Sequence, residues 1–167
     1  VTVEEPNGAL ASRSEFDNAF VGAETLTSLL TGASTAGSWS IILSADTDVC
    51  TGSPGVTCLI TEADVRGNTK VSFDSFDLAV SSAGGAIVLA GSATANATGS
   101  ITSVGSSLAV CANTVAPASC TTDNIVPSAN VTVTSITPID VSPGQVVRVA
   151  FTLTLADAVA PVASTGL

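Results

Sequence analysis

The amino-acid sequence predicts an all-β protein, a single β-sandwich or jelly roll of about eight strands. The chain has 167 residues, of which 46% are hydrophobic and only 11% are charged. Short stretches rich in valine, threonine and isoleucine recur along it, and turns containing glycine, proline, serine or asparagine separate them. No alternation of strands with long helices and no repeat of fixed period is visible, which disfavours a parallel α/β fold and a repeat architecture.

The N-terminal region is expected to combine a short extended segment with one short helix. Residues 1–12 are a predicted N-terminal extension, a strand that ends at a Pro-Asn-Gly turn, and residues 13–167 are the predicted sandwich domain. Between residues 14 and 31 the large apolar residues roughly follow a helical period, whereas the interspersed threonines and glycines suit an extended chain. We favour a short helix or helical turn in this stretch.

From residue 38 onwards the pattern is one strand after another. The clearest is segment 145–155, where large apolar residues alternate with arginine, alanine and threonine, as on a half-buried strand. In segment 70–80 the alternation changes phase at Asp74, which predicts a β-bulge. Turn signals at 83–85 and 141–144 separate neighbouring strands. The remaining expected strands are, in chain order, 39–44, 56–61, 86–94, 101–111 and 130–137.

Four cysteines occur in two close pairs, and each pair flanks a segment of turn-forming residues. Three pairings are possible, and the turn formers favour the local bridges Cys50–Cys58 and Cys111–Cys120. Zinc is disfavoured because its paired thiolate ligands normally lie closer in sequence. Disulfides indicate folding outside a reducing cytosol. Because the chain begins at Val1 without a methionine or a signal sequence, we expect a secreted mature form, extracellular or at the cell surface.

The residue types that carry most enzyme chemistry are scarce. The absence of histidine excludes a Ser-His-Asp or Cys-His site and histidine-ligated metals, and no phosphate-binding glycine loop is present. We therefore expect no enzymatic activity and no resident cofactor other than a calcium ion. The net charge of −10 argues against nucleic acid as a partner. No apolar run reaches the roughly 18 residues of a membrane-spanning helix, so we expect no membrane insertion of the mature chain.

Two sequence patterns mark candidate sites for an attached glycan or a bound calcium ion. Asn96 and Asn130 each begin an Asn-X-Thr sequon, so both are candidate glycosylation sites. Paired acidic residues flank the first cysteine pair, and loop carboxylates of this kind suit calcium; the alternative is that they are solvated loop charges. The candidate calcium ligands are Asp46, Asp48, Glu62 and Asp64.

The composition favours the subunit of an extracellular filament or pilus that binds copies of itself. A chain that is apolar and poor in charge suits a protein whose faces are buried by neighbouring subunits. The edge strands of an open sandwich can accept an added strand through backbone hydrogen bonds. The expected donor is residues 1–10, with residues 158–167 as the second choice. The expected polymerisation residues are Val1, Thr2 and Val3 in the donor and Val147, Val149, Phe151 and Leu153 in the acceptor groove.

A short N-terminal segment, Val1-Thr-Val-Glu-Glu-Pro, before a run of β-strands resembles the secreted jelly-roll or β-sandwich pilins of archaea and bacteria, which polymerise by donor-strand complementation. The resemblance covers the architecture and no diagnostic motif. It implies a homopolymer in a sheath, biofilm or pilus. One alternative is a secreted surface binding module or adhesin, stabilised by calcium, which would be a monomer. A viral coat or appendage protein would share the same composition.

Overall fold

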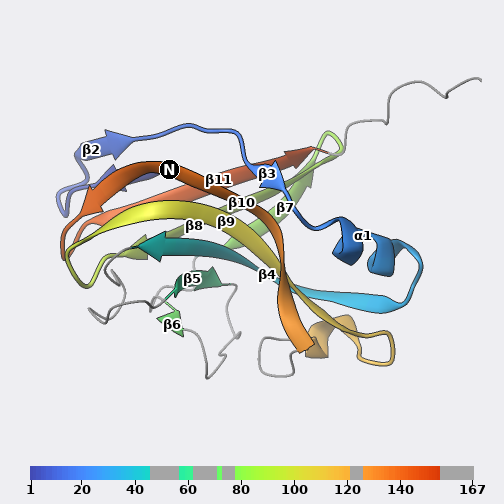
Figure 1. Cartoon of the computed structure of the whole chain (residues 1–167). Helices are drawn as coiled ribbons and strands as arrows, with labels where there is room; N and C mark the ends of the chain where they lie inside the picture. The colour runs from blue at the N-terminus through green and yellow to red at the C-terminus, as the bar shows by residue number, and fades with distance from the viewer. Residues whose placement is uncertain (46–56, 62–70, 73–77, 121–125, 155–167) are drawn as a thin grey trace, which may run out of the picture.

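In a computed structural model the chain forms two stacked sheets, which confirms the predicted all-β sandwich (Figure 1). The structure describes residues 1–45, 57–61, 71–72, 78–120 and 126–154. The five-stranded sheet contains, in spatial order, β2 (Leu10–Arg13), β1 (Thr2–Glu4), β11 (Val146–Thr154), β8 (Ala86–Thr94) and β7 (Ala79–Ala83). The six-stranded sheet contains β3 (Ala19–Phe20), β10 (Val126–Val141), β9 (Gly99–Ala112), β4 (Ser34–Ala45), β5 (Thr57–Thr61) and β6 (Val71–Ser72).

Most predicted strands are present, with different bounds. β8 spans the predicted 86–94, while β10 is much longer than the predicted 130–137 because it follows β9 through three register shifts. Segment 70–80, predicted as one strand, instead contains β6 and the start of β7. The bulge predicted at Asp74 lies outside the described residues. The sequence pattern missed β2 and β3, because strands of four and two residues are too short to show alternation.

The region between residues 14 and 31 is partly extended and partly helical. The helix α1 (Ala23–Leu30) confirms the expected short helix, but residues 14–18 are not helical and lead into β3. The N-cap residue Gly22 offers no side-chain hydrogen bond to the first turn. Leu26 and Leu29 on one side of the helix are half-buried, whereas Leu30 at its end is 78% exposed. Packing of this one apolar stripe therefore holds α1 in place.

Two consecutive glycines fix the hairpin that joins β7 to β8 in the five-stranded sheet. Gly84 and Gly85 have φ values of 58° and 81°, and they join β7 to β8 by the two-residue connection that the turn signal at 83–85 predicts. Positive φ at both central residues is the requirement of a type I′ turn, which glycine meets without steric cost. The register of this hairpin pairs Ala83 with Ala86. It sets which residues of β8 face the core.

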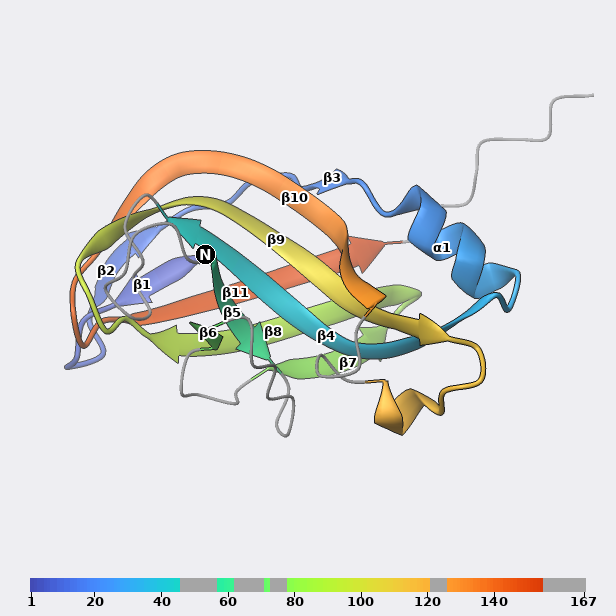
Figure 2. The same ribbon diagram turned by 60° about the horizontal axis from the view of Figure 1, so that its bottom comes forward.

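The core lies between the two sheets. Figure 2 shows the long, curved β10, β9 and β4 lying over β11, β8 and β7. Large aliphatic side chains from both layers interlock there and exclude water, which supplies the main stabilisation of such a sandwich. The largest fully buried members are Ile41, Leu43, Ile60, Leu89, Ile101, Val3, Val104, Val141 and Val147.

The predicted Cys111–Cys120 disulfide is present, with the Cα atoms 5.7 Å apart. It joins the end of β9 to the residue after a short 3-10 turn, η1 (Pro117–Ser119). Cys120 is buried, and its carbonyl accepts a hydrogen bond from the Ser38 backbone N–H at 3.3 Å. The bridged loop is thereby folded back onto β4. Cys50 and the side chain of Cys58 lie outside the described part of the structure, so the second predicted bridge stays a prediction.

Removal of this disulfide is expected to destabilise the protein. The bridge closes a loop of about ten residues, so the double substitution Cys111→Ala with Cys120→Ala should lower the free energy of unfolding by about 2–3 kcal/mol. For a domain of this size the melting temperature should fall by roughly 4–12 °C. Thermal unfolding followed by circular dichroism measures the shift. An unchanged melting temperature would mean that the bridge constrains neither the folded nor the unfolded chain.

Candidate functional site

The last strand, β11, is only partly covered on one side. It pairs with β8 along its whole length, from Val146 to Thr154. On its other side it pairs with β1, and only at Val146, Val147 and Arg148. Within the described residues, the six positions from Val149 to Thr154 have no strand neighbour on the β1 side. We call this stretch the open edge.

An apolar groove of about 910 Å³ lies beside the open edge. It is bounded by β11 on one sheet, by β4, β9 and β10 on the other, and by α1 together with the chain that joins β2 to β3. Figures 1 and 2 both place α1 and β3 at the end of the sandwich where β11 ends. The large apolar residues of the apolar groove are Phe16, Phe20, Leu26, Leu29, Trp39, Ile87, Leu108, Val131, Phe151 and Leu153.

The segment from Ser14 to Asn18 borders the apolar groove and is fixed by a few specific contacts. The ring of Phe16 meets the ring of Phe151 edge to face, with centroids 6.5 Å apart. The Asn18 side-chain nitrogen donates to Thr132 Oγ1 at 2.7 Å, and this oxygen lies 2.8 Å from Ser106 Oγ. Because Thr132 and Ser106 are buried, these bonds satisfy polar groups that would otherwise destabilise the sheet.

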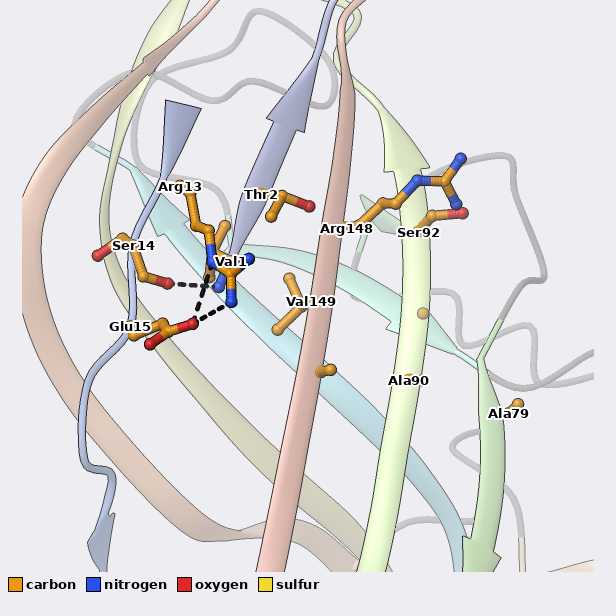
Figure 3. Close-up of a pocket in the computed structure, with 12 residues that line it drawn as sticks. Val1, Thr2, Arg13, Ser14, Glu15, Ala79, Ala90, Ser92, Arg148 and Val149 are labelled. Atoms are coloured by element: carbon orange, nitrogen blue, oxygen red, sulfur yellow. Dashed lines mark hydrogen bonds and ion pairs between the residues drawn. The ribbon is translucent and has the colours of Figure 1, made fainter. Parts of the chain in front are cut away.

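The N-terminal strand is anchored in the sheet of its own chain. The Val1 ammonium donates to the Ser14 carbonyl at 2.8 Å, and the Ser14 N–H donates to the Val1 carbonyl at 2.8 Å (Figure 3). Val3 is 1% exposed and lies opposite Val147. Glu4 forms an ion pair with Arg148 at 2.9 Å. The segment predicted as a strand donor therefore occupies part of the acceptor edge of its own subunit.

The charged groups around Val1 compensate one another. Burial lowers the pKa of the Val1 ammonium below its usual 8.0, Arg13 lowers it further, and Glu15 opposes both effects. The Arg13 guanidinium donates to the Glu15 carboxylate, which lowers the pKa of that carboxyl. Together with Arg148 these residues line a hollow of about 720 Å³ over β1, β11 and β8 (Figure 3). Both guanidinium groups of the hollow, those of Arg13 and Arg148, have carboxylate partners in Glu15 and Glu4.

The predicted polymerisation residues fall into three places. Val3 and Val147 face each other where β1 pairs with β11, with Thr2 opposite Arg148. Val149 is buried in the core. Phe151 and Leu153 line the apolar groove beside the open edge, as does Val1. The structure thus brings the two predicted sets together within one chain. Among the described residues, the part of β11 without a partner on the β1 side is the half that contains Phe151 and Leu153.

The other candidate residues lie apart from the apolar groove. The four predicted calcium ligands, Asp46, Asp48, Glu62 and Asp64, lie outside the described residues, and the described ranges hold no cluster of three or more acidic or cysteine residues that could bind a metal. Asn96 and Asn130 are both exposed, as a glycosylation acceptor must be. No helix in the described ranges is long and apolar enough to span a membrane.

Sequence reasoning missed much of the lining of the apolar groove. Phe16, Leu26 and Leu29 appear in the sequence as a helical pattern, which signals burial but not the surface that they cover. Trp39 has the signature of a core or interface anchor, and it is one wall of the groove. No family model, curated protein or solved structure matches the chain.

Proposed function

We propose that the protein is the structural subunit of an extracellular filament or pilus, in which copies of the chain join by adding a β-strand from one subunit to a sheet of the next. The observation that supports this function best is the open edge of β11, which runs beside an apolar groove. A strand placed there gains backbone hydrogen bonds on one side and apolar burial on the other. Both requirements of strand addition are met at one place.

The backbone groups and the lack of charge along the open edge favour a polypeptide as the occupant of the groove. Alternate residues of a strand direct their N–H and C=O groups to the same side, so about three of the six residues of the open edge can each exchange hydrogen bonds with an added strand. Exposed edges of this kind invite pairing with another chain unless they are covered or charged. The side chains of Val149–Thr154 include no charge. The open edge therefore lacks the feature that most often blocks strand addition.

The rest of the molecule is consistent with a secreted, non-catalytic subunit. The Cys111–Cys120 bridge is typical of proteins that fold in oxidising compartments. Exposed apolar residues of β3, β7 and β10 would be covered by neighbours in a polymer. They are Phe20, Val80 and Val133. We infer no catalytic activity, since the chain lacks histidine, the usual base beside a serine or cysteine nucleophile.

A charge placed in the apolar groove is expected to block assembly. Leu153→Lys puts an ammonium where an added strand would bury apolar side chains, so it should leave the chain monomeric. Because Leu153 is only half-buried at the end of β11, the monomer should keep its fold. Leu10→Lys is the matched control, since Leu10 is 62% exposed on β2 and lies outside the groove.

Size-exclusion chromatography with light scattering, run over a range of concentrations, measures the effect. We expect polymer for the natural chain and for Leu10→Lys, and monomer for Leu153→Lys. If Leu153→Lys assembles like the natural chain, strand addition does not use the apolar groove. If Leu10→Lys alone blocks assembly, the contact between subunits lies at β2.

A further inference from the structure

We propose that the strand added to the open edge is the C-terminal segment, residues 155–167, of a neighbouring copy. This inference rests on the proposed function and names the donor within it. It departs from the expectation that residues 1–10 are the donor. Three observations carry it: the anchoring of β1, the place where β11 ends, and the sequence of the segment itself.

The N-terminal strand is held in its own subunit by several contacts. β1 pairs with β11 on one side and with β2 on the other. Val1 and Ser14 exchange two hydrogen bonds, Val3 is buried in the core, and Glu4 pairs with Arg148. Exchange of this strand between copies would only remake the same contacts in a neighbour. In either arrangement, the open edge from Val149 to Thr154 has no partner on the β1 side among the described residues.

β11 ends at the apolar groove, and the C-terminal segment follows it in the sequence. Thr154, the last residue of β11, lines the groove, and thirteen residues follow in the sequence. At about 3.3 Å per residue an extended segment of this length spans roughly 40 Å. The open edge of six residues takes about half of that. The segment is therefore long enough to pair along the whole open edge of a neighbouring copy.

The sequence after β11 disfavours a return to the same chain. A two-residue hairpin that folded the segment back onto its own β11 would need positive φ in its turn, for which pairs such as Asn-Gly, Asp-Gly and Gly-Gly are preferred. The β7–β8 connection has Gly84 and Gly85, and the β10–β11 connection has Gly144 at a φ of 88°. The residues after Thr154 are Leu-Ala-Asp-Ala, in which Asp157 is not followed by the glycine of a preferred pair. The segment is therefore expected to leave its own subunit and pair with another.

The position of Pro161 fixes how the segment can pair. Proline favours an extended conformation for the residue before it, and it fits an added strand only where its missing N–H points away from the acceptor. In a strand, N–H groups alternate in direction, so the even-numbered residues would bond to β11. These residues are Ala156, Ala158, Ala160 and Val162, all small and apolar.

Two matched proline substitutions in the full-length chain test this inference. Ala158→Pro removes an N–H that should bond to β11, so this variant should remain monomeric. Ala163→Pro introduces the same residue at an odd position, where the N–H points away, so it should assemble like the natural chain. Both positions lie beyond β11, and both variants should keep the melting temperature of a folded monomer, measured at a concentration below assembly.

A synthetic peptide of residues 155–167 supplies the second readout. Added in excess to the Ala158→Pro monomer, it should raise the melting temperature, whereas the same peptide carrying Ala158→Pro should not. Assembly of the Ala158→Pro chain would overturn the inference and leave the proposed function standing. If the natural chain stays monomeric while the peptide still binds to the Ala158→Pro chain, the segment fills the groove of its own subunit. That result would overturn both the inference and the proposed function. A natural chain that neither assembles nor is altered by the proline would contradict the proposed function itself.

Discussion

Replacement of Phe151 with alanine is expected to have the largest effect on stability of the changes in the groove. Phe151 is 6% exposed, lies in the core cluster and contacts the ring of Phe16. Truncation of a buried aromatic side chain to alanine costs about 3–5 kcal/mol, because contacts are lost and a cavity remains. For a domain of this size the melting temperature should fall by roughly 6–20 °C. Thermal unfolding of the monomer measures this shift.

Leu30→Ala is the control for this prediction. Leu30 is a large apolar residue that is 78% exposed at the end of α1, so its truncation should change the melting temperature by less than about 2 °C. Phe151→Ala should also weaken assembly, since it removes part of the wall against which an added strand packs. Equal melting temperatures for the two variants would contradict the position assigned to Phe151 in the core.

The substitution Gly37→Ala is expected to disrupt the packing of the disulfide loop on β4. A Cβ atom at Gly37 would lie 1.9 Å from the carbonyl oxygen of Cys120 and 2.7 Å from its sulfur. These atoms belong to a buried, cross-linked residue that cannot move aside freely. Overpacking of this kind costs about 3 kcal/mol, with a fall in melting temperature of roughly 6–12 °C. The hydrogen bond from the Ser38 N–H to the Cys120 carbonyl should break as well.

Ser38→Ala, a substitution at the next residue, is the control for this prediction. It tests whether any change in this part of β4 destabilises the protein or only the added Cβ atom at Gly37 does. The Ser38 hydroxyl oxygen is buried and has no hydrogen-bond partner. Its removal should leave the free energy of unfolding unchanged or slightly higher, because a buried polar group without a partner is unfavourable. If Gly37→Ala is as stable as the natural protein, the loop does not approach β4 as closely as described.

The long strands could be predicted from the sequence because apolar and polar residues alternate along each of them, as buried and exposed positions do on a strand. In β11, Val147, Val149 and Phe151 are buried and the residues between them are exposed, so the alternation reports the face of the sheet directly. The turn at Gly84 and Gly85 is predictable for a similar local reason, since few residues other than glycine adopt its conformation. The Cys111–Cys120 bridge follows from spacing and turn formers.

The site could be predicted only in part, because it depends on contacts between distant segments. Alternation identified Phe151 and Leu153 as inward-facing, but it does not tell where a strand partner ends. β1 pairs with only three residues of β11, Val146 to Arg148, because β1 itself spans only Thr2–Glu4. The wall formed by α1 and Phe16 depends on how residues 14–22 cross from one sheet to the other. No local pattern records that crossing.

Negative-stain electron microscopy of the purified full-length chain tests the central claim most directly. If subunits join by strand addition at the open edge, the images should show filaments of uniform width at concentrations where Leu153→Lys shows only isolated particles. Discrete particles of a single subunit for the natural chain, persisting at high concentration and after long incubation, would contradict the proposal that the protein is a filament subunit.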